Sequence, residues 1–224
     1  MVFAHTSCTR FIPEQAFLDI AFDGEHLGGG LAANNCDYVD VIPLDVWRAQ
    51  YTFRQTGVIP MLLPQNHAAF NSWHKKPKEM PDLWSKSTRT LLAMLLIHDI
   101  NFFATLCCQE DMDAYKKRLD EFGAVDSEFL PYWNNSDIVT SSNDKLKVSV
   151  YRKKGKSLLA FANVGNDDLS ADVKVELQKL GLQGSLKAKD LLTGQDIPIT
   201  GAGLIPVKVP KKDYGMILLV AKEE

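Results

Sequence analysis

The sequence lacks the features that identify several large classes of protein. Its four cysteines, Cys8, Cys36, Cys107 and Cys108, show no CxxC spacing, which argues against a zinc ribbon or a thioredoxin-type redox site. Positive charge is not in excess either, because 25 Lys and Arg face 28 Asp and Glu, a formal net charge of -3 at pH 7. No arginine-rich stripe is present to bind a phosphate backbone, so we expect no nucleic-acid partner.

Long apolar runs and targeting signals are also missing. The longest apolar stretch, LLAMLLI at 91–97, is far shorter than the roughly 20 residues that a membrane span needs. The N-terminal MVFAHTSCTR has no basic region and few apolar residues, so it does not form a signal peptide. We therefore expect a soluble chain with no membrane partner and no targeting signal of its own.

Motifs for cofactors and metals are absent in the same way. Gly28, Gly29 and Gly30 are not followed by the Lys-Ser/Thr of a P-loop, and their spacing is not GxGxxG, which excludes nucleotide binding. His67 and His74 lie seven residues apart without a third ligand, so they are interpreted as surface histidines. The sequence predicts no cofactor and no metal.

The first part of the chain, residues 1–125, alternates short apolar runs with helical patterns. The runs at 2–4, 17–22, 58–63 and 99–106 are typical of strands, and helices are predicted over 44–55, 82–97 and about 111–122. The glycines at 28–30 are predicted to form a loop. Alternation of this kind favours a parallel sheet with helices packed outside it, so this part is assigned to the α/β class.

The second part, residues 126–224, has a different pattern. Seven short strands are predicted at 146–152, 157–163, 171–176, 186–190, 197–200, 204–209 and 214–220, with glycine turns between them. VKVEL at 173–177 alternates apolar and polar residues, as half-exposed antiparallel strands do. The sequence therefore predicts an all-β domain, an antiparallel β-sandwich.

The stretch FLDIAFDGEHLGGG at 17–30 is the strongest candidate for a functional site. Asp23 and Glu25 follow a buried strand two residues apart, so they point to one side if the strand continues. Two carboxyl groups on one face can do acid and base chemistry. The plainer interpretation is a strand-to-loop turn with solvated acids, because Asp-Gly is common in turns.

Other polar residues follow the predicted strands. His5 ends the first strand, His26 follows the two acids, and Gln65 and Asn66 follow the strand at 58–63. Trp73 lies in a polar loop, where its ring is able to stack against a sugar. Cys107 and Cys108 are interpreted as inert thiols, because a nucleophilic cysteine needs a nearby base.

A succession of motifs resembles a known family. His5-Thr6-Ser7, Asp23-Gly24-Glu25, VIPLDVWRAQYTFRQTGVIPMLLPQ, LLAMLLIHDINFF, FLPYWNN and LLAFANVGND occur in this order along nearly the whole chain. Together they resemble the C-terminal portion of glycoside-hydrolase-like (β/α)8 barrel proteins, relatives of the α-galactosidase and β-N-acetylgalactosaminidase type of enzyme. These proteins carry a β-sandwich after the barrel.

The resemblance implies a carbohydrate substrate and a site at the C-terminal ends of the strands. Glu25 is then the proton donor or acceptor, and Asp23 is a second carboxylate that orients the sugar or stabilises positive charge on it. His5, His26, Gln65, Asn66 and Trp73 are the expected substrate-binding residues. Retaining, inverting and substrate-assisted mechanisms all stay open, because backbone spacing does not fix the distance between the carboxyl groups.

The resemblance also implies an incomplete barrel. A (β/α)8 barrel has eight strands, whereas residues 1–125 are predicted to hold about four. We therefore expect a truncated product, an incomplete gene model, or a chain that self-associates through the open edge of its sheet. The compartment stays open, because full-length relatives could be exported.

Three functions are consistent with these patterns. The first is a glycoside hydrolase, or a piece of one, that acts through Glu25 and Asp23. The second is a non-catalytic carbohydrate-binding or assembly module, in which the sandwich supplies the binding surface. The third is an interaction protein without a sugar ligand.

Overall fold

The computed structural model describes residues 1–6, 13, 16–52, 58–201 and 203–221. Contacts divide the chain into two compact units, Met1–Ala114 and Tyr115–Glu224. The boundary lies inside helix α7, Gln109–Phe122, somewhat earlier in the chain than the change of sequence pattern at 125/126. The first unit is an α/β unit and the second is an antiparallel β unit, as the two patterns predict.

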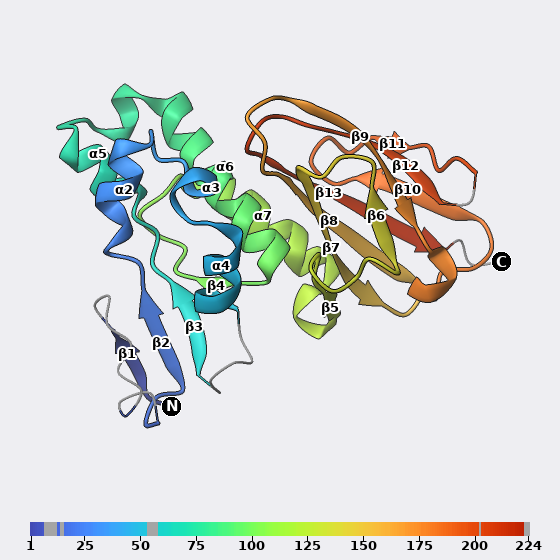
Figure 1. Cartoon of the computed structure of the whole chain (residues 1–224), viewed down its shortest axis with the longest axis horizontal. Helices are drawn as coiled ribbons and strands as arrows, with labels where there is room; N and C mark the ends of the chain where they lie inside the picture. Colours follow the sequence, from blue (N-terminus) through green and yellow to red (C-terminus); the bar gives the residue numbers. More distant parts are fainter. Residues whose placement is uncertain (7–12, 14–15, 53–57, 202, 222–224) are drawn as a thin grey trace. The chain divides into compact units, whose positions relative to one another are not determined.

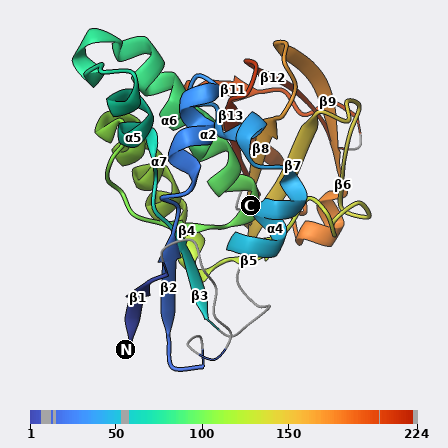
Figure 2. The same cartoon turned by 60° about the vertical axis from the view of Figure 1, so that its left-hand side comes forward.

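A four-stranded parallel sheet forms the centre of the first unit. Its strands are β1 (Phe3–His5), β2 (Ile20–Asp23), β3 (Ile59–Leu62) and β4 (Asn101–Phe102), and they lie in this order across the sheet. Figures 1 and 2 show β1, β2 and β3 side by side. Each strand lies within or overlaps a predicted apolar run. The parallel order brings the C-terminal ends of all four strands to one edge of the sheet.

Helices connect these strands. The segment from β2 to β3 contains α2 (Leu27–Ala33), α3 (Tyr38–Val41) and α4 (Leu44–Tyr51), and the segment from β3 to β4 contains α5 (Asn66–Ser72), the 3-10 turn Pro77–Glu79 and α6 (Pro81–His98). Helix α6 confirms the prediction over 82–97. The predicted end of the helix at 44–55 lies outside the described residues. Helices α2, α3 and α5 were not predicted, because each has too few residues to show a helical period.

The helix α6 explains the LLAMLLI stretch. All seven side chains from Leu91 to Ile97 have no exposed surface, so this part of the helix is apolar on every side because every side is covered. Pro81 occupies the first turn and Asp99 ends the helix with a left-handed backbone conformation, φ 54°. None of the helices among the described residues is long and apolar enough to cross a membrane.

Two predictions at the start of the central stretch are wrong. Phe17 lies before β2 and is 79% exposed, so the buried strand is shorter than the apolar run. The glycines at 28–30 do not form a loop but lie inside helix α2. The side chain of Ala68 in α5 would lie 3.2 Å from a Cβ on Gly28, and this close packing of α2 against α5 explains why a glycine stands there.

The second unit is a β-sandwich of two antiparallel sheets. The larger sheet contains β5 (Glu128–Leu130), β7 (Leu146–Lys153), β8 (Lys156–Asn163), β10 (Leu186–Asp190), β11 (Asp196–Ile197) and β13 (Tyr214–Ala221), in the order β11-β10-β13-β8-β7-β5. The smaller contains β6 (Val139–Ser141), β9 (Leu169–Val175) and β12 (Leu204–Val209), in the order β12-β9-β6. All seven predicted strands have a counterpart here, and β5 and β6 were not predicted. The 3-10 turns Ala124–Asp126 and Leu177–Leu180 complete the unit.

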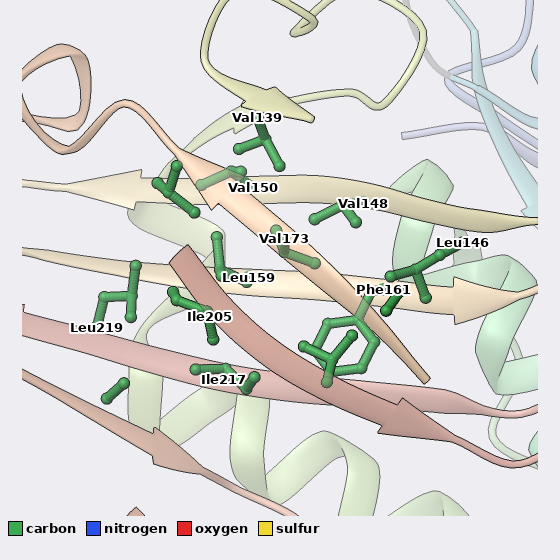
Figure 3. Packing of buried hydrophobic residues seen from close by; sticks show 14 of the residues in the cluster. Val139, Leu146, Val148, Val150, Leu159, Phe161, Val173, Ile205, Ile217 and Leu219 are labelled. Atoms are coloured by element: carbon green, nitrogen blue, oxygen red, sulfur yellow. The ribbon is translucent and has the colours of Figure 1, made fainter. Parts of the chain in front are cut away.

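Alternating side chains of the two sheets form the core of the sandwich. Strand β9 is buried at every odd residue from Leu169 to Val175 and exposed at every even one. Figure 3 shows Val173 and Ile205 of the smaller sheet over Leu159 and Ile217 of the larger one. The sequence pattern that predicted half-exposed strands therefore corresponds to one face in this core and one face in solvent.

Candidate functional site

The candidate site lies where β1, β2 and β3 end. The backbone N–H of Thr6 donates to the carbonyl of Phe22 (3.1 Å), and that of Leu63 donates to the carbonyl of Asp23 (2.9 Å). These bonds continue the sheet one residue beyond each strand. They bring the segments that contain His5, Asp23 and Leu63 next to one another, at the edge where parallel α/β folds carry their ligands.

Gly24 makes this arrangement possible. Its φ is +156°, and a Cβ at this position would lie 2.1 Å from the backbone oxygen of Leu63. No side chain fits in that space, so a residue other than glycine would push the ends of β2 and β3 apart. Directly after Gly24 the chain turns into α2, and the carbonyl of Gly24 accepts a hydrogen bond from the N–H of Leu27 (2.9 Å).

Glu25 lies in this turn and faces His5. The Oε2 atom of Glu25 is 3.6 Å from Nε2 of His5, longer than a direct hydrogen bond but within the reach of a charge interaction or one bridging water. The Glu25 side chain is 54% exposed and that of His5 is 29% exposed. A carboxylate beside an imidazole, both open to solvent, is able to exchange a proton with a bound molecule.

Asp23 has a different environment. Its side chain is only 4% exposed, Oδ1 accepts a hydrogen bond from the N–H of Gly24 (2.7 Å), and the same oxygen lies 3.5 Å from Nδ1 of His26. Asp23 is the register partner of the buried Leu62, whereas the preceding Phe22 pairs with His5. Because side chains alternate along a strand, Asp23 points to the sheet face opposite Phe22.

Asp23 and Glu25 therefore do not lie on one face of a continuous strand. Strand β2 ends at Asp23, so the extended geometry assumed from the sequence does not reach Glu25. Each carboxylate instead has an imidazole of its own, Glu25 with His5 and Asp23 with His26. The site combines one exposed and one buried acid at the end of the same strand.

Gln65 and Asn66 belong to a buried polar network. The hydroxyl of Tyr38 donates to Oδ1 of Asn66 (3.0 Å) and accepts from the backbone N–H of Gln65 (2.7 Å), while Nδ2 of Asn66 donates to Oγ of Ser87 (2.7 Å). Asn66 has no exposed surface and Gln65 is 6% exposed. This network fixes the turn after β3 from inside. Asn66 has no free surface for a sugar, so we assign it to positioning this turn.

Trp73 is distant in sequence from the two acids and caps the C-terminal end of helix α5. Its indole N–H donates to the carbonyl of Ala32 in α2 (3.1 Å), and its ring packs against Phe70 at 5.2 Å between centroids. These contacts join the C-terminal ends of α2 and α5. Ser7, the last residue of the first family motif, lies outside the described residues.

An aromatic surface that was not predicted from the sequence lies beside the site. Phe3 stacks on Phe22 (4.8 Å between centroids), His5 stacks on Phe22 (4.5 Å), and Phe103 contacts both Phe3 and Phe22 edge to face. Phe3 is 45% exposed. The alternation of Phe3 and His5 along β1 was the signal that places both on one face of the sheet.

Among the described residues, no group of three His, Cys, Asp or Glu side chains is arranged to hold a metal ion. Burial raises the pKa of the Cys36 thiol to about 12, and burial together with Cys108 and Asp111 raises the pKa of Cys107 to about 12. Both thiols stay protonated at neutral pH, so neither is a nucleophile.

A protein-family comparison matches the second part of the chain. Residues 112–220 match the family described as "Glycoside hydrolase 123, C-terminal domain". The resemblance of the sequence to the C-terminal portion of glycoside hydrolases is thus confirmed. No curated protein matches the sequence.

Solved structures with a similar fold are α-amylases. An Anoxybacillus α-amylase matches with a TM-score of 0.54 and 9% identity, over 99% of this chain and 52% of that one. The maltogenic α-amylase AmyB from Thermotoga neapolitana gives 0.55 and 10%, over 98% and 54%. The Geobacillus thermoleovorans α-amylase GTA, solved with acarbose, gives 0.57 and 10%, over 99% and 53%. The chain spans about half the length of these structures, and at this identity the likeness concerns the fold.

Proposed function

We propose that this chain is the C-terminal part of a glycoside hydrolase, with Glu25 as its catalytic acid and base. The observation that carries the proposal is the exposed Glu25 carboxylate, 3.6 Å from the His5 imidazole at the ends of neighbouring parallel strands. Barrel enzymes place their chemistry on the loops at this end of their strands. The match to a glycoside hydrolase C-terminal domain supports carbohydrate as the substrate class.

In this proposal Glu25 protonates the leaving oxygen of the glycosidic bond. His5 holds the carboxyl group in place and exchanges a proton with it between steps. The proton moves from the Glu25 carboxyl group to the oxygen as the bond to the sugar carbon breaks, and a water that later attacks the sugar returns a proton to the Glu25 carboxylate.

Asp23 has the role of a positioning residue. Its carboxylate is buried and contacts the His26 imidazole, whose side chain is 35% exposed. Asp23 therefore orients His26 toward the substrate, and its negative charge favours the positive charge that develops on the sugar ring. The substrate contacts then come from His5, His26 and the segment that contains Gln65, with the aromatic surface of Phe3 and Phe22 as the platform for the apolar face of the sugar.

We further propose that the four parallel strands belong to a (β/α)8 barrel. Their order, β1-β2-β3-β4, follows the chain, and helices connect them, as in such a barrel. The described residues contain four of the eight strands that a barrel needs. Closure of the sheet by further strands would complete the wall opposite Glu25.

The test is turnover of a panel of aryl glycosides by this chain and by a form that continues N-terminally. We expect release of the aryl group, and Glu25→Gln should lower kcat by about a hundredfold or more, because a positioned acid or base contributes about 10²- to 10⁴-fold. Glu79→Gln, at an acid far along the chain on the turn before α6, is the matched control. Turnover that survives Glu25→Gln unchanged contradicts the assignment.

The second candidate is a carbohydrate-binding module without catalysis. The family match favours it, because residues 112–220 cover the sandwich and not the two acids. Saturable binding of glycosides without turnover in either form of the chain would support this candidate over the first. Self-association through the open edge of the parallel sheet stays a prediction, and measuring the mass in solution by light scattering tests it.

A further inference from the structure

A cationic segment follows helix α5 in the first unit. It spans residues 74–78 and contains Lys75, Lys76 and Lys78, which are all exposed. Among the described residues, no carboxylate forms an ion pair with any of these three ammonium groups. The carboxylate nearest in sequence, that of Glu79, instead accepts a hydrogen bond from the backbone N–H of Lys76 (3.1 Å). The segment is therefore a local concentration of positive charge on a chain whose formal net charge is -3.

The lysine side chains are not needed to end the helix. The backbone N–H groups of His74 and Lys75 donate to the carbonyls of Asn71 and Phe70 (3.0 Å each). His74 has the left-handed conformation, φ 56°, that this kind of helix end requires. Backbone groups thus occupy carbonyls in the last turn of α5 that would otherwise attract cations. The ammonium groups stay available to a ligand.

Hydrogen bonds on both sides hold the segment in shape. Directly before it, the indole N–H of Trp73 donates to the carbonyl of Ala32 in α2 (3.1 Å). Directly after it, the N–H of Met80 donates to the carbonyl of Pro77 (3.1 Å) in the 3-10 turn Pro77–Glu79. A binding site that is formed before the ligand arrives loses little entropy on binding.

The segment and the candidate site lie at opposite ends of the same pair of helices. Helix α2 begins two residues after Glu25, and α5 begins after the turn that follows β3. The first turns of the two helices pack together, since a Cβ on Gly28 would lie 3.2 Å from that of Ala68. Figure 1 shows both helices beyond the tips of β2 and β3. Helix α5 has seven residues and is about 10 Å long, which sets the separation between the lysines and the sheet edge.

Polar side chains follow α5 from the sheet edge to the segment. His67 and Asn71 are exposed one helical turn apart, and Nδ1 of His67 lies 3.2 Å from Nδ2 of Asn71. The backbone N–H of His67 donates to the carbonyl of Leu106 (3.1 Å), which follows β4, so the helix begins at the edge that carries the candidate site. Imidazole and amide groups form hydrogen bonds with hydroxyl groups. An oligosaccharide that starts at Glu25 therefore has polar partners along α5.

We propose that the lysines of segment 74–78 bind an acidic group, a carboxylate or a sulfate, of an oligosaccharide whose other end lies at Glu25. The inference rests on the proposed function, because it takes a carbohydrate at Glu25 as the substrate, and it narrows that substrate to an acidic oligosaccharide. Since α5 separates the lysines from Glu25, the acidic group belongs to a sugar unit other than the one at Glu25. Binding energy from such a remote group holds the reacting bond in place.

The test is an NMR titration of the isotope-labelled full chain at low salt with two acidic sugars. Trigalacturonate carries carboxylates, and a κ-carrageenan tetrasaccharide carries sulfates. We expect saturable shifts of the backbone amides at 74–76 and 78 with at least one of them, weaker at high salt because exposed charges are screened. The neutral maltotriose should give no such shifts. Equal shifts with maltotriose, or no saturable shifts with either acidic sugar, would overturn the proposal.

Inorganic pyrophosphate tests for attraction between charges alone. The acidic sugar should also shift the amides at 67 and 71, because it lies along α5, whereas pyrophosphate is too short to do so. We expect pyrophosphate to bind the segment more weakly than the acidic sugar. Pyrophosphate that binds as tightly would refute a site for a saccharide.

Two double variants locate the binding. Lys75→Gln with Lys78→Gln should weaken binding about tenfold, because each exposed ion pair contributes up to about fivefold. Lys187→Gln with Lys189→Gln removes two exposed charges from β10 and is the matched control, which should keep the wild-type affinity. All four side chains are exposed, so the fold is retained. Equal affinity of the wild type and the first double variant refutes the site.

The outcomes separate the two proposals. Aryl glycosides are too short to reach the lysines, so their turnover tests Glu25 alone, and Glu79→Gln remains the control for it. Binding of an acidic sugar at the segment without turnover removes the catalytic proposal and keeps this site. Glu25-dependent turnover of aryl glycosides without binding of either acidic sugar does the reverse.

Discussion

Gly24 determines how closely β2 and β3 approach at the candidate site. A Cβ there would lie 2.1 Å from the oxygen of Leu63, and φ is +156°. We expect Gly24→Ala to lower the free energy of unfolding by about 3 kcal/mol, from clash and backbone strain together.

Gly155 provides the control for this prediction. Its φ is +74°, but a Cβ would meet no atom within 4 Å. Gly155→Ala should therefore cost only about 1 kcal/mol, the strain of the left-handed backbone. Urea unfolding of the two variants measures the difference, and equal losses would mean that the close contact with Leu63 is not formed.

His98 should make stability depend on pH. It is 1% exposed, Nδ1 lies 2.8 Å from the carbonyl of Met94, and its ring packs against Trp47. Burial, and to a lesser extent Arg48, lower its pKa to about 4, although the bond to Met94 raises it. The unfolded chain takes up a proton below its ordinary pKa of about 6.5, whereas the folded chain stays neutral down to about 4.

Stability is therefore fully present above about pH 6.5 and is lost as the pH falls toward 4. Between about pH 7 and pH 5 we expect a loss of about 2 kcal/mol from this residue. Urea unfolding at both values measures it, and His98→Gln should remove most of the difference. A wild type and a variant with the same pH dependence would contradict the assignment.

At the scale of the element, substitutions in helix α2 test whether the glycines at 28–30 are helical. Gly29 is exposed in the helix with no atom within 4 Å of a Cβ, whereas Gly28 packs against Ala68. Gly29→Ala should stabilise the protein by about 0.5 to 1 kcal/mol, because alanine favours a helix over glycine. Gly28→Val should destabilise it by about 1 to 3 kcal/mol through overpacking.

Thermal or urea unfolding of both variants measures these changes in stability. Destabilisation by Gly29→Ala would show that 28–30 forms the loop expected from the sequence rather than a helix.

Part of the fold and of the candidate site was predictable from the sequence. Strands β7 to β13 were predictable because alternation or a long apolar run marks each of them, and α6 was predictable because eighteen residues carry a helical pattern between Pro81 and His98. Helix α2 was not, since it is short and two of its glycines, Gly28 and Gly30, pack against side chains of other helices rather than forming a turn. The positions of His5, Asp23, Glu25 and His26 near one another followed from the parallel strands. Their pairing did not, because it depends on the turn at Gly24.

At the scale of the whole molecule, the second unit has a core of its own. The buried cluster of the sandwich draws on β6 to β10, β12 and β13, all inside residues 115–224. We expect a fragment of residues 109–224 to fold alone, with a β-rich circular dichroism spectrum and a cooperative unfolding transition. A fragment without such a transition would mean that the sandwich depends on the first unit.

The central claim is that a sugar binds at the ends of β1 and β2, and the imidazole resonances test it most directly. The chain has five histidines, of which His5 and His26 lie beside the two acids, whereas the buried His98 serves as the internal control. We predict that an aryl glycoside shifts the ring signals of His5 and His26 saturably and leaves that of His98 unchanged. Saturable binding of the glycoside with no change at His5 or His26 would contradict the account.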